Sequence, residues 1–474
     1  MNAAKNSNGE GVDLLQITPI RRLVQWQGFP YVLQVLLLAV FVLLAVISWG
    51  HYTPAGVNAK LYGKTNLVTL LIWGIWWPAM IWTAVLFGRA WCAVCPLELV
   101  SNLSERLGRR LGIRQWPLRR WVISGRLIVA LYALIQFLVA GAHINRVPAY
   151  TSLFLVGLLA MAFVTGLIFR DRAFCRGFCP VGQLLATYGR GGMLAVRAGS
   201  GATCGACTGR DCIMACNRSK ADARSCPSLL NPPKLNSNRD CLVCGQCIKS
   251  CQPDNMRLLL RRPFPRSDVR EPRANWPTTL FVMLVSGFVM WELLAEWPKA
   301  EETFVTLPHR VSQWAGVSGL AGYLNGLWAL VAVPLGFWTL MWLIIRLSGD
   351  ASGLASTWQR MALPTAVVIS AGHMAKGLAK FVSWVGFLQF ALKDPLGLTT
   401  VGGMSKKTLA QPASLLPESV VASLGVALVL GGLFFAIREA RLAHSGSPPN
   451  YCILIPKVAL ACAFVFIVIG WAFK

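Results

Sequence analysis

Long apolar stretches separated by shorter polar loops recur along the whole chain. Several stretches contain about 20 residues without a charge, the length of helix that crosses a bilayer core of about 30 Å. The pattern therefore predicts an all-α polytopic membrane protein with about nine transmembrane helices. The predicted spans cover residues 30–49, 67–88, 121–141, 149–169, 277–297, 325–347, 361–391, 418–437 and 452–473. A mean hydropathy of +0.54 with only 14% charged residues agrees with this class.

Lys and Arg residues are distributed unevenly among the predicted loops. The loop 89–120 contains seven of them and the stretch 170–273 contains eighteen, whereas 50–66 and 142–148 contain two and one. Basic loops remain in the cytoplasm, so we expect the two basic stretches and the N-terminus to be cytosolic. The net charge of +26 follows from this topology. We expect no nucleic-acid partner, because no nucleic-acid-binding motif accompanies the charge.

An internal repeat places cysteines after the second and the fourth span. In both copies Arg-Ala-aromatic-Cys is followed by Cys-Pro, over residues 89–96 and 172–180. Because both copies follow an even-numbered span, their cysteines should lie on the same cytosolic face. We expect a joint metal or further cluster site of iron, copper or zinc, although redox-active dithiols or small buried residues that shape the span ends are alternatives. The cysteines are Cys92, Cys95, Cys175 and Cys179.

A polar, cysteine-rich insert divides the membrane-embedded sequence. The N-terminal segment 1–29, polar to amphipathic, precedes a four-helix membrane block at 30–190, and a Gly-rich linker at 189–201 leads to the insert at 202–260. A five-helix membrane block at 276–474 follows it. The insert has few large apolar residues, so we expect a bound metal group to hold it together.

The cysteine spacing in the insert predicts its cofactor. One run reads Cys241-x2-Cys244-x2-Cys247-x3-Cys251, the spacing of bacterial ferredoxins, in which three thiolates hold one [4Fe–4S] cluster and the fourth reaches a second cluster. A structural zinc site normally needs two CxxC pairs with a longer spacer. The run therefore predicts a ferredoxin-like domain with two [4Fe–4S] clusters.

A second run supplies the partner cluster. It reads Cys204-x2-Cys207-x4-Cys212-x3-Cys216, and Cys226-Pro227 follows ten residues later. The ligands cross between clusters, so the first cluster should take Cys204, Cys207, Cys212 and Cys251, and the second Cys241, Cys244, Cys247 and Cys216. Cys226 competes with Cys216 because a proline normally follows the crossing ligand. The x3 spacing favours Cys216.

These motifs resemble those of the NapH/NosR-type membrane polyferredoxins. The matching positions are Cys175, Cys179 and Pro180 with the runs 204–216 and 241–251, and the resemblance extends over about 30–300. It implies a multi-pass protein of the bacterial cytoplasmic membrane with its ferredoxin domain in the cytosol. Such proteins pass electrons between the quinone pool or a cytosolic donor and a partner redox enzyme, often periplasmic. Members also act as accessory proteins in metalloenzyme maturation.

The seventh predicted span contains an unusual group of polar residues. His373, Lys376 and Lys380 share one helix face, and Glu292 and Glu296 in span five are candidate counter-charges. Charged groups in hydrocarbon are costly, so a quinone, anion or proton site is one interpretation. Snorkelling lysines in a differently placed span are the other. No span carries a histidine pair for haem, and the sequence has no nucleotide-binding motif.

Three functions are compatible with these features. The first is an electron-transfer subunit of an oxidoreductase system rather than a stand-alone enzyme, with a flavodoxin or ferredoxin as a candidate donor. The second is a metalloenzyme assembly factor that uses the clusters to reduce a metal or a thiol. The third is a transporter in which the cluster is a sensor or scaffold. We rank them in this order from the cysteine motifs.

Overall fold

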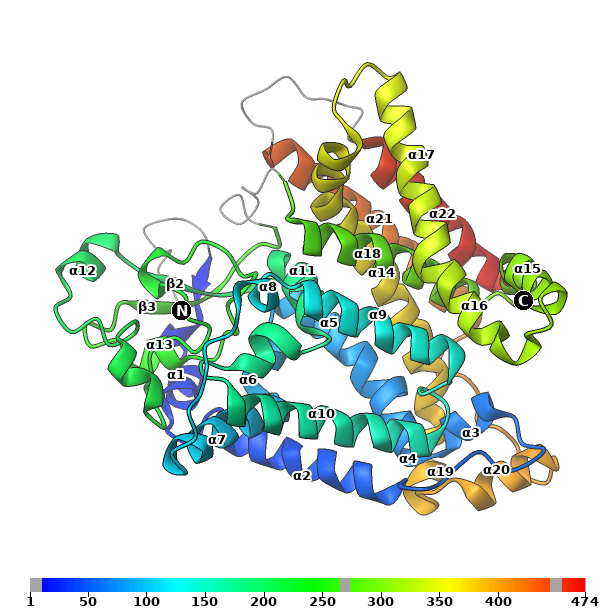
Figure 1. Ribbon diagram of the computed structural model, residues 1–474, viewed down its shortest axis with the longest axis horizontal. Helices are drawn as coiled ribbons and strands as arrows, with labels where there is room; N and C mark the ends of the chain where they lie inside the picture. Colours follow the sequence, from blue (N-terminus) through cyan, green and yellow to red (C-terminus); the bar gives the residue numbers. More distant parts are fainter. Residues whose placement is uncertain (1–10, 265–272, 444–453, 474) are drawn as a thin grey trace. The chain divides into compact units, whose positions relative to one another are not determined.

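The computed structural model describes residues 11–264, 273–443 and 454–473, and helices make up most of them (Figure 1). This confirms the all-α fold class. The longer helices are α2 (Tyr31–Ile47), α5 (Trp77–Phe87), α7 (Pro96–Arg110), α9 (Arg126–Gly141), α10 (Pro148–Ile168), α14 (Trp276–Leu294), α15 (Pro298–Trp314), α17 (Val333–Leu347), α18 (Leu354–Trp384), α21 (Glu418–Ala443) and α22 (Ile455–Gly470).

Six helical stretches in the described part of the chain are long and apolar enough to cross a membrane. They are Leu67–Phe87, Pro148–Ile168, Trp276–Leu294, Ser318–Leu347, Glu418–Glu439 and Ile455–Phe473. The predicted number of nine is not confirmed. Helices α2 and α9 have 17 and 16 residues, so they extend only about 24–26 Å. The start of the last predicted span, 452–453, lies outside the described residues.

Helix α18 is the third predicted span that falls outside this set. It has 31 residues, ample length for a bilayer, but polar residues such as His373 and Lys376 lower its mean hydropathy. Most of its central residues are buried by other helices rather than exposed. Its polar side chains are therefore positioned inside a helical bundle.

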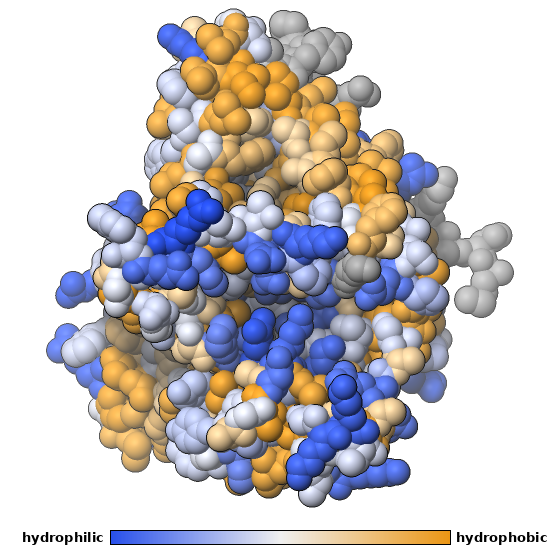
Figure 2. Space-filling model, turned by 90° about the vertical axis from the view of Figure 1, so that its right-hand side faces the viewer, coloured by the Kyte–Doolittle hydropathy of each residue, from blue (hydrophilic) through white to orange (hydrophobic). Residues whose placement is uncertain are grey.

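Large apolar side chains cover much of the outer surface of the described helices. Figure 2 shows wide apolar areas on the viewed face, next to patches of hydrophilic residues. Examples are Leu36 and Leu43 on α2, Leu153 on α10 and Phe434 on α21, each more than half exposed. Such an apolar exterior is unusual for a water-soluble protein and suits lipid contact. Together with the six apolar stretches, it identifies a multi-pass membrane protein.

The chain forms two compact units. The first contains residues 1–41, 83–128 and 157–270, and the second contains 42–82, 129–156 and 271–474. In the second unit, α18 packs against α14, α21 and α22. Gly432 of α21 allows close packing there, because a Cβ atom at this position would lie 2.4 Å from Ala371 Cβ of α18. Small residues of this kind let membrane helices approach closely.

The first unit contains a small antiparallel sheet in the order β1-β3-β2, with β1 at Val12–Asp13, β2 at Leu194–Ala198 and β3 at Met256–Leu260. Val12 pairs with Leu260, and Ala195 pairs with Leu259. The expectation of a linker throughout 189–201 was therefore wrong. Residues 194–198 form a mostly apolar strand that pairs with β3 at the end of the insert.

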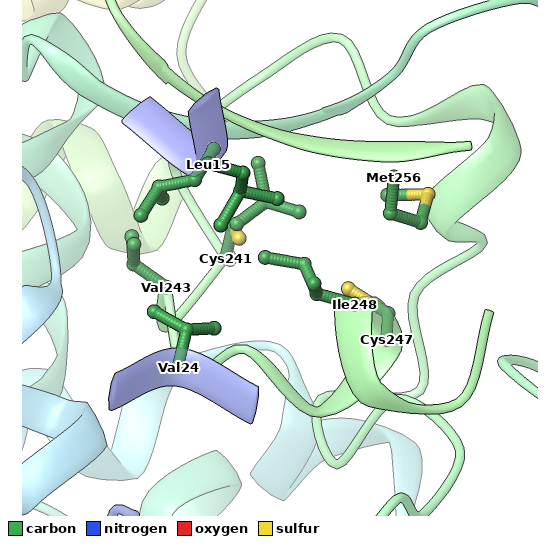
Figure 3. Close-up of a cluster of buried hydrophobic side chains, with 9 residues drawn as sticks. Leu15, Val24, Cys241, Val243, Cys247, Ile248 and Met256 are labelled. Atoms are coloured by element: carbon green, nitrogen blue, oxygen red, sulfur yellow. The ribbon is translucent and has the colours of Figure 1, made fainter. Parts of the chain in front are cut away.

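Residues before the first apolar helix complete the core of the insert. Leu15, and Val24 on α1 (Thr18–Gln25), pack with Cys241, Ile248 and Met256 in a buried cluster (Figure 3). The insert has few large apolar residues of its own, and apolar side chains of the N-terminal segment complete its core. This contact was not predicted from the sequence.

Gly245 shapes the cysteine loop at the start of α13 (Gln246–Lys249). Its φ of 72° is left-handed, and a Cβ atom there would lie 2.9 Å from Val24 Cγ1. We expect Gly245→Ala to destabilise this loop by about 1–3 kcal/mol. The measurable result is a lower apparent unfolding temperature of the anaerobically purified protein. Gly201→Ala is the control, because nothing lies within 4 Å of its added Cβ; equal effects would contradict the account.

Candidate functional site

Four thiols of the first cysteine set surround one cavity of the insert. Cys204 on α12 (Gly201–Ala206), Cys207, Cys212 and Cys251 all line this cavity, whose volume is ≈ 510 Å³. Burial raises the pKa of the Cys212 thiol to about 11, with further contributions from the neighbouring thiols Cys251 and Cys204. The structure thus brings together the four residues that the crossing rule assigned to one cluster.

Asn255 holds two thiols of this first set. Its backbone N–H donates to Cys251 Sγ at 3.2 Å, and its side-chain Nδ2 donates to Cys204 Sγ at 3.1 Å. It also accepts a hydrogen bond from the Ser200 backbone N–H at 2.9 Å. Asn255 was not predicted from the sequence. Only its position, four residues after Cys251, could have drawn attention to it.

The second set contains Cys226, Cys241, Cys244 and Cys247, which together line another cavity. Backbone N–H groups of Val243 and Gln246 donate to the sulfurs of Cys241 and Cys244. Burial raises the pKa of the Cys244 thiol to about 12. Buried sulfurs that accept backbone hydrogen bonds are typical of iron–sulfur ligands, since such bonds tune the cluster.

Cys216 and Cys226 occupy different environments. Cys216 lies on the 3-10 helix η5 (Ala215–Ser219) and is exposed, whereas the Cys226 thiol interacts electrostatically with those of Cys241, Cys244 and Cys247. Of the two candidates for the fourth ligand, Cys226 lines the cavity of the second set. The chain from 217 to 225 folds back and brings Cys226 there, a long-range effect that the x3 spacing does not describe.

The two thiol sets are direct neighbours. The Cys226 backbone N–H of the second set donates to the Cys212 carbonyl of the first at 2.9 Å. Cys212 also contributes to the electrostatic environment of Cys247. Electron exchange between groups bound at these two sites would therefore cover a short distance.

The donor set fits iron–sulfur clusters. Burial keeps these thiols protonated near neutral pH, and binding of a metal group would displace those protons. Among the described residues, no group of three or more His, Cys, Asp or Glu side chains has the geometry for one metal ion. A [4Fe–4S] cube carries its thiolates on four separate iron atoms, so its sulfurs stand farther apart than around a single ion.

A buried carboxylate connects the first repeat motif to the insert. Glu98 of α7 pairs with Arg172 Nε at 3.0 Å and Arg224 Nη2 at 2.9 Å, and accepts a hydrogen bond from Gln34 at 2.8 Å. Burial alone would raise the pKa of Glu98, but Arg224 and Arg172 outweigh it and lower this pKa to about 2. Glu98 was not among the residues predicted from the sequence.

We expect Glu98→Gln to leave two buried arginines without their shared carboxylate. Removal of one member of a buried ion pair typically costs about 3–5 kcal/mol, so the apparent unfolding temperature should fall by several degrees. The matched control is Asp254→Asn, because its pair with Arg21 is about half exposed and contributes little. Similar unfolding temperatures for the two variants would contradict this role.

The repeat motifs bring their four cysteines together. Cys92 on α6 (Ala90–Val94) and Cys95 interact electrostatically with Cys175, on the π-helix η3 (Phe174–Phe178), and with Cys179. Burial is the largest contribution and raises the pKa of Cys95, Cys175 and Cys179. The shared location expected from the repeat is thus present within the first unit.

The charged group on α18 lies in the second unit. Lys376 Nζ is 2.7 Å from Glu296 Oε1 and 3.8 Å from Glu292 Oε2, so both glutamates are counter-charges, as expected. The His373 ring lies near Trp77 and Phe288, with centroids 6.3 and 6.0 Å apart. The two glutamates satisfy the buried Lys376 charge, which favours a structural role for this group.

Comparison with protein-family models finds a "4Fe-4S binding domain" twice, at residues 69–114 and 152–197. The two matches cover the two repeat motifs. Together with the apolar helices and the thiol sets, they define the class of this chain as a multi-pass iron–sulfur membrane protein.

Several curated relatives are similar to this chain. The chain is 26% identical over 181 residues to "Ferredoxin-type protein NapH" of Haemophilus influenzae, covering 36% of this chain and 62% of the relative. It is 30% identical over 138 residues to the methylamine utilization ferredoxin-type protein MauN of Methylorubrum extorquens, covering 26% and 47%. It is 25% identical over 326 residues to the putative electron transport protein YccM of Escherichia coli, covering 57% and 87%.

The chain is thus similar to the NapH-type ferredoxin membrane proteins, in agreement with the resemblance inferred from its motifs. The match spans less than two thirds of the length of the NapH relatives. No solved structure matches the chain.

We expect Asn255→Leu to lower the reduction potential of a cluster at the first thiol set, because hydrogen bonds to sulfur stabilise the reduced state. The shift should be roughly tens of millivolts, measured by EPR-monitored redox titration. Gln252→Leu is the control, since its side chain bonds Asp211 rather than a sulfur. An unchanged potential in the Asn255 variant would contradict the predicted role.

Proposed function

We propose that this chain is a membrane-bound iron–sulfur electron-transfer protein. It passes electrons between a cytosolic donor or the quinone pool and a partner redox enzyme. The observation that carries the proposal is the pair of adjacent four-thiol sets, joined by the hydrogen bond from Cys226 N–H to the Cys212 carbonyl. The NapH, MauN and YccM relatives, named as ferredoxin-type or putative electron transport proteins, support it.

Each thiol set of the insert binds one [4Fe–4S] cluster in this proposal. The first cluster is held by Cys204, Cys207, Cys212 and Cys251, and the second by Cys226, Cys241, Cys244 and Cys247. Cys226 replaces Cys216 as the crossing ligand, which is supported by its burial beside the other three thiols and by Pro227 directly after it. The clusters supply one-electron chemistry, while the protein holds them close together.

The donor side of the proposal rests on charge. Arg210 and Lys234 line the cavity of the first thiol set, with Asp211 as an acidic residue there. Basic residues at this opening would attract an acidic donor such as a flavodoxin or ferredoxin. The basic loops support a cytosolic location of the insert in a bacterial cell. The acceptor is a quinone or a partner redox enzyme.

Serine variants of the two rival cysteines test the cluster assignment. We expect Cys226→Ser to remove or convert the second cluster, with a loss of up to about four iron atoms per chain. Cys216→Ser should retain wild-type iron, sulfide and EPR signals because its thiol is exposed. The reverse result would reject the assignment.

Electron flow tests the function itself. The anaerobically purified full chain is oxidised and mixed with a reduced flavodoxin, and a second sample is reduced with dithionite, freed of excess reductant and mixed with a water-soluble quinone. Appearance of the reduced-cluster EPR signal in the first sample, and its loss with stoichiometric quinone reduction in the second, support the proposal. Clusters that neither accept electrons from flavodoxin nor reduce the quinone would overturn these donor and acceptor assignments.

A further inference from the structure

The two repeat motifs share one local structure. In each, a short helix ends at a cysteine, a proline follows, and a further helix begins: α6, Cys95, Pro96 and α7 in the first motif. The second motif has η3, Cys179, Pro180 and α11 (Gly182–Tyr188). The same turn therefore presents a cysteine pair twice.

Close contacts join the two motifs. Arg172, three residues before Cys175, contacts Glu98, three residues after Cys95, at 3.0 Å. Gly192 lies so close to Gly88 that a Cβ atom added at Gly192 would be 2.3 Å from the Gly88 nitrogen. These contacts bracket the four cysteines from both sides and hold the two pairs in one place.

Neither motif can hold a four-iron cluster alone. The segment 69–114 contains Cys92 and Cys95 as its only cysteines, and 152–197 contains Cys175 and Cys179 as its only cysteines. A [4Fe–4S] cluster normally requires four thiolates. Each segment matches a "4Fe-4S binding domain" but supplies only two of the four thiolates. The two segments together supply a full ligand set.

Two buried arginines lie next to these thiols. Arg89 hydrogen-bonds the Cys92 sulfur and is also close to Cys179, while Arg172 interacts electrostatically with Cys175 and Cys92. Arg89 and Arg172 are 8% and 4% exposed. Within the described residues, Arg89 Nε and Arg172 Nη2 are buried and make no hydrogen bond. Buried N–H donors without an acceptor, next to thiols, indicate a binding site for an anionic group.

We propose that Cys92, Cys95, Cys175 and Cys179 bind a third [4Fe–4S] cluster, in a proposal that rests on the electron-transfer function above. A cluster carried by four thiolates is anionic, which suits the two arginines. A single zinc or copper ion suits the site less well, because no described group of Cys, His, Asp and Glu has the geometry for one ion.

Arg172 also connects this third site to the insert. It interacts electrostatically with Cys244 of the second thiol set as well as with Cys175 and Cys92. In this transfer the second cluster would be oxidised by one electron and the third cluster would be reduced by one electron. No bond would form or break. The third cluster would thereby carry electrons from the insert to the ends of the apolar helices.

Iron and acid-labile sulfide counts on the full chain test the proposal, combined with Mössbauer spectroscopy after anaerobic reconstitution. We expect about twelve iron and twelve sulfide per wild-type chain. The Cys92→Ser/Cys175→Ser double variant should lose a third of both and retain the spectra of the insert clusters. Cys216→Ser, with an exposed thiol, is the control and should match wild type.

Two results would overturn this inference without touching the function proposed above. One is a fully reconstituted wild-type protein with about eight iron and eight sulfide. The other is iron without matching sulfide that the double variant loses, which would indicate a single ion. A protein that binds no iron–sulfur cluster at all would instead reject the electron-transfer proposal.

Discussion

The buried carboxylate of Glu98 is the interaction on which the thiol-bearing unit depends. It joins Arg172 from the second repeat motif and Arg224 from the insert at 3.0 and 2.9 Å, and Gln34 of α2 completes its coordination. Each arginine is close to cysteines: Arg172 to Cys175 and Cys244, and Arg224 to Cys244. A single ionised group thus holds three segments, distant in sequence, around the proposed cofactors. Such a network is costly to bury and is stable only with all of its partners present.

Short-range features of the site were predictable from the sequence, and long-range features were not. The 241–251 run encodes its loop locally, because its cysteine spacing and the left-handed Gly245 suffice to wrap three thiols round one point. The position of Cys226 beside the second set depends on how residues 217–225 fold back, which no spacing rule captures. The roles of Asn255 and Glu98 were not predictable for the same reason, since their partners Cys204 and Arg224 lie 51 and 126 residues away.

The same distinction applies to the fold. Apolar runs predicted the helices well, since hydropathy is a local property, but not which helices are long enough to cross a bilayer. The polar residues of α18 lower its hydropathy, and their counter-charges are distant in sequence: Glu292 lies on α14 and Glu296 in the turn after it. Likewise, residues 11–25 looked peripheral in sequence, yet Val12 extends the sheet and Leu15 and Val24 fill the core of the insert.

Low-temperature EPR of the dithionite-reduced protein tests whether the insert holds two adjacent [4Fe–4S] clusters. The contact between Cys226 and Cys212 places the two sets so close that the reduced clusters should interact magnetically. The account predicts a split, fast-relaxing signal from coupled [4Fe–4S] centres rather than the sum of two isolated ones. A metal-loaded sample that contains zinc, lacks sulfide and gives no such signal would contradict it.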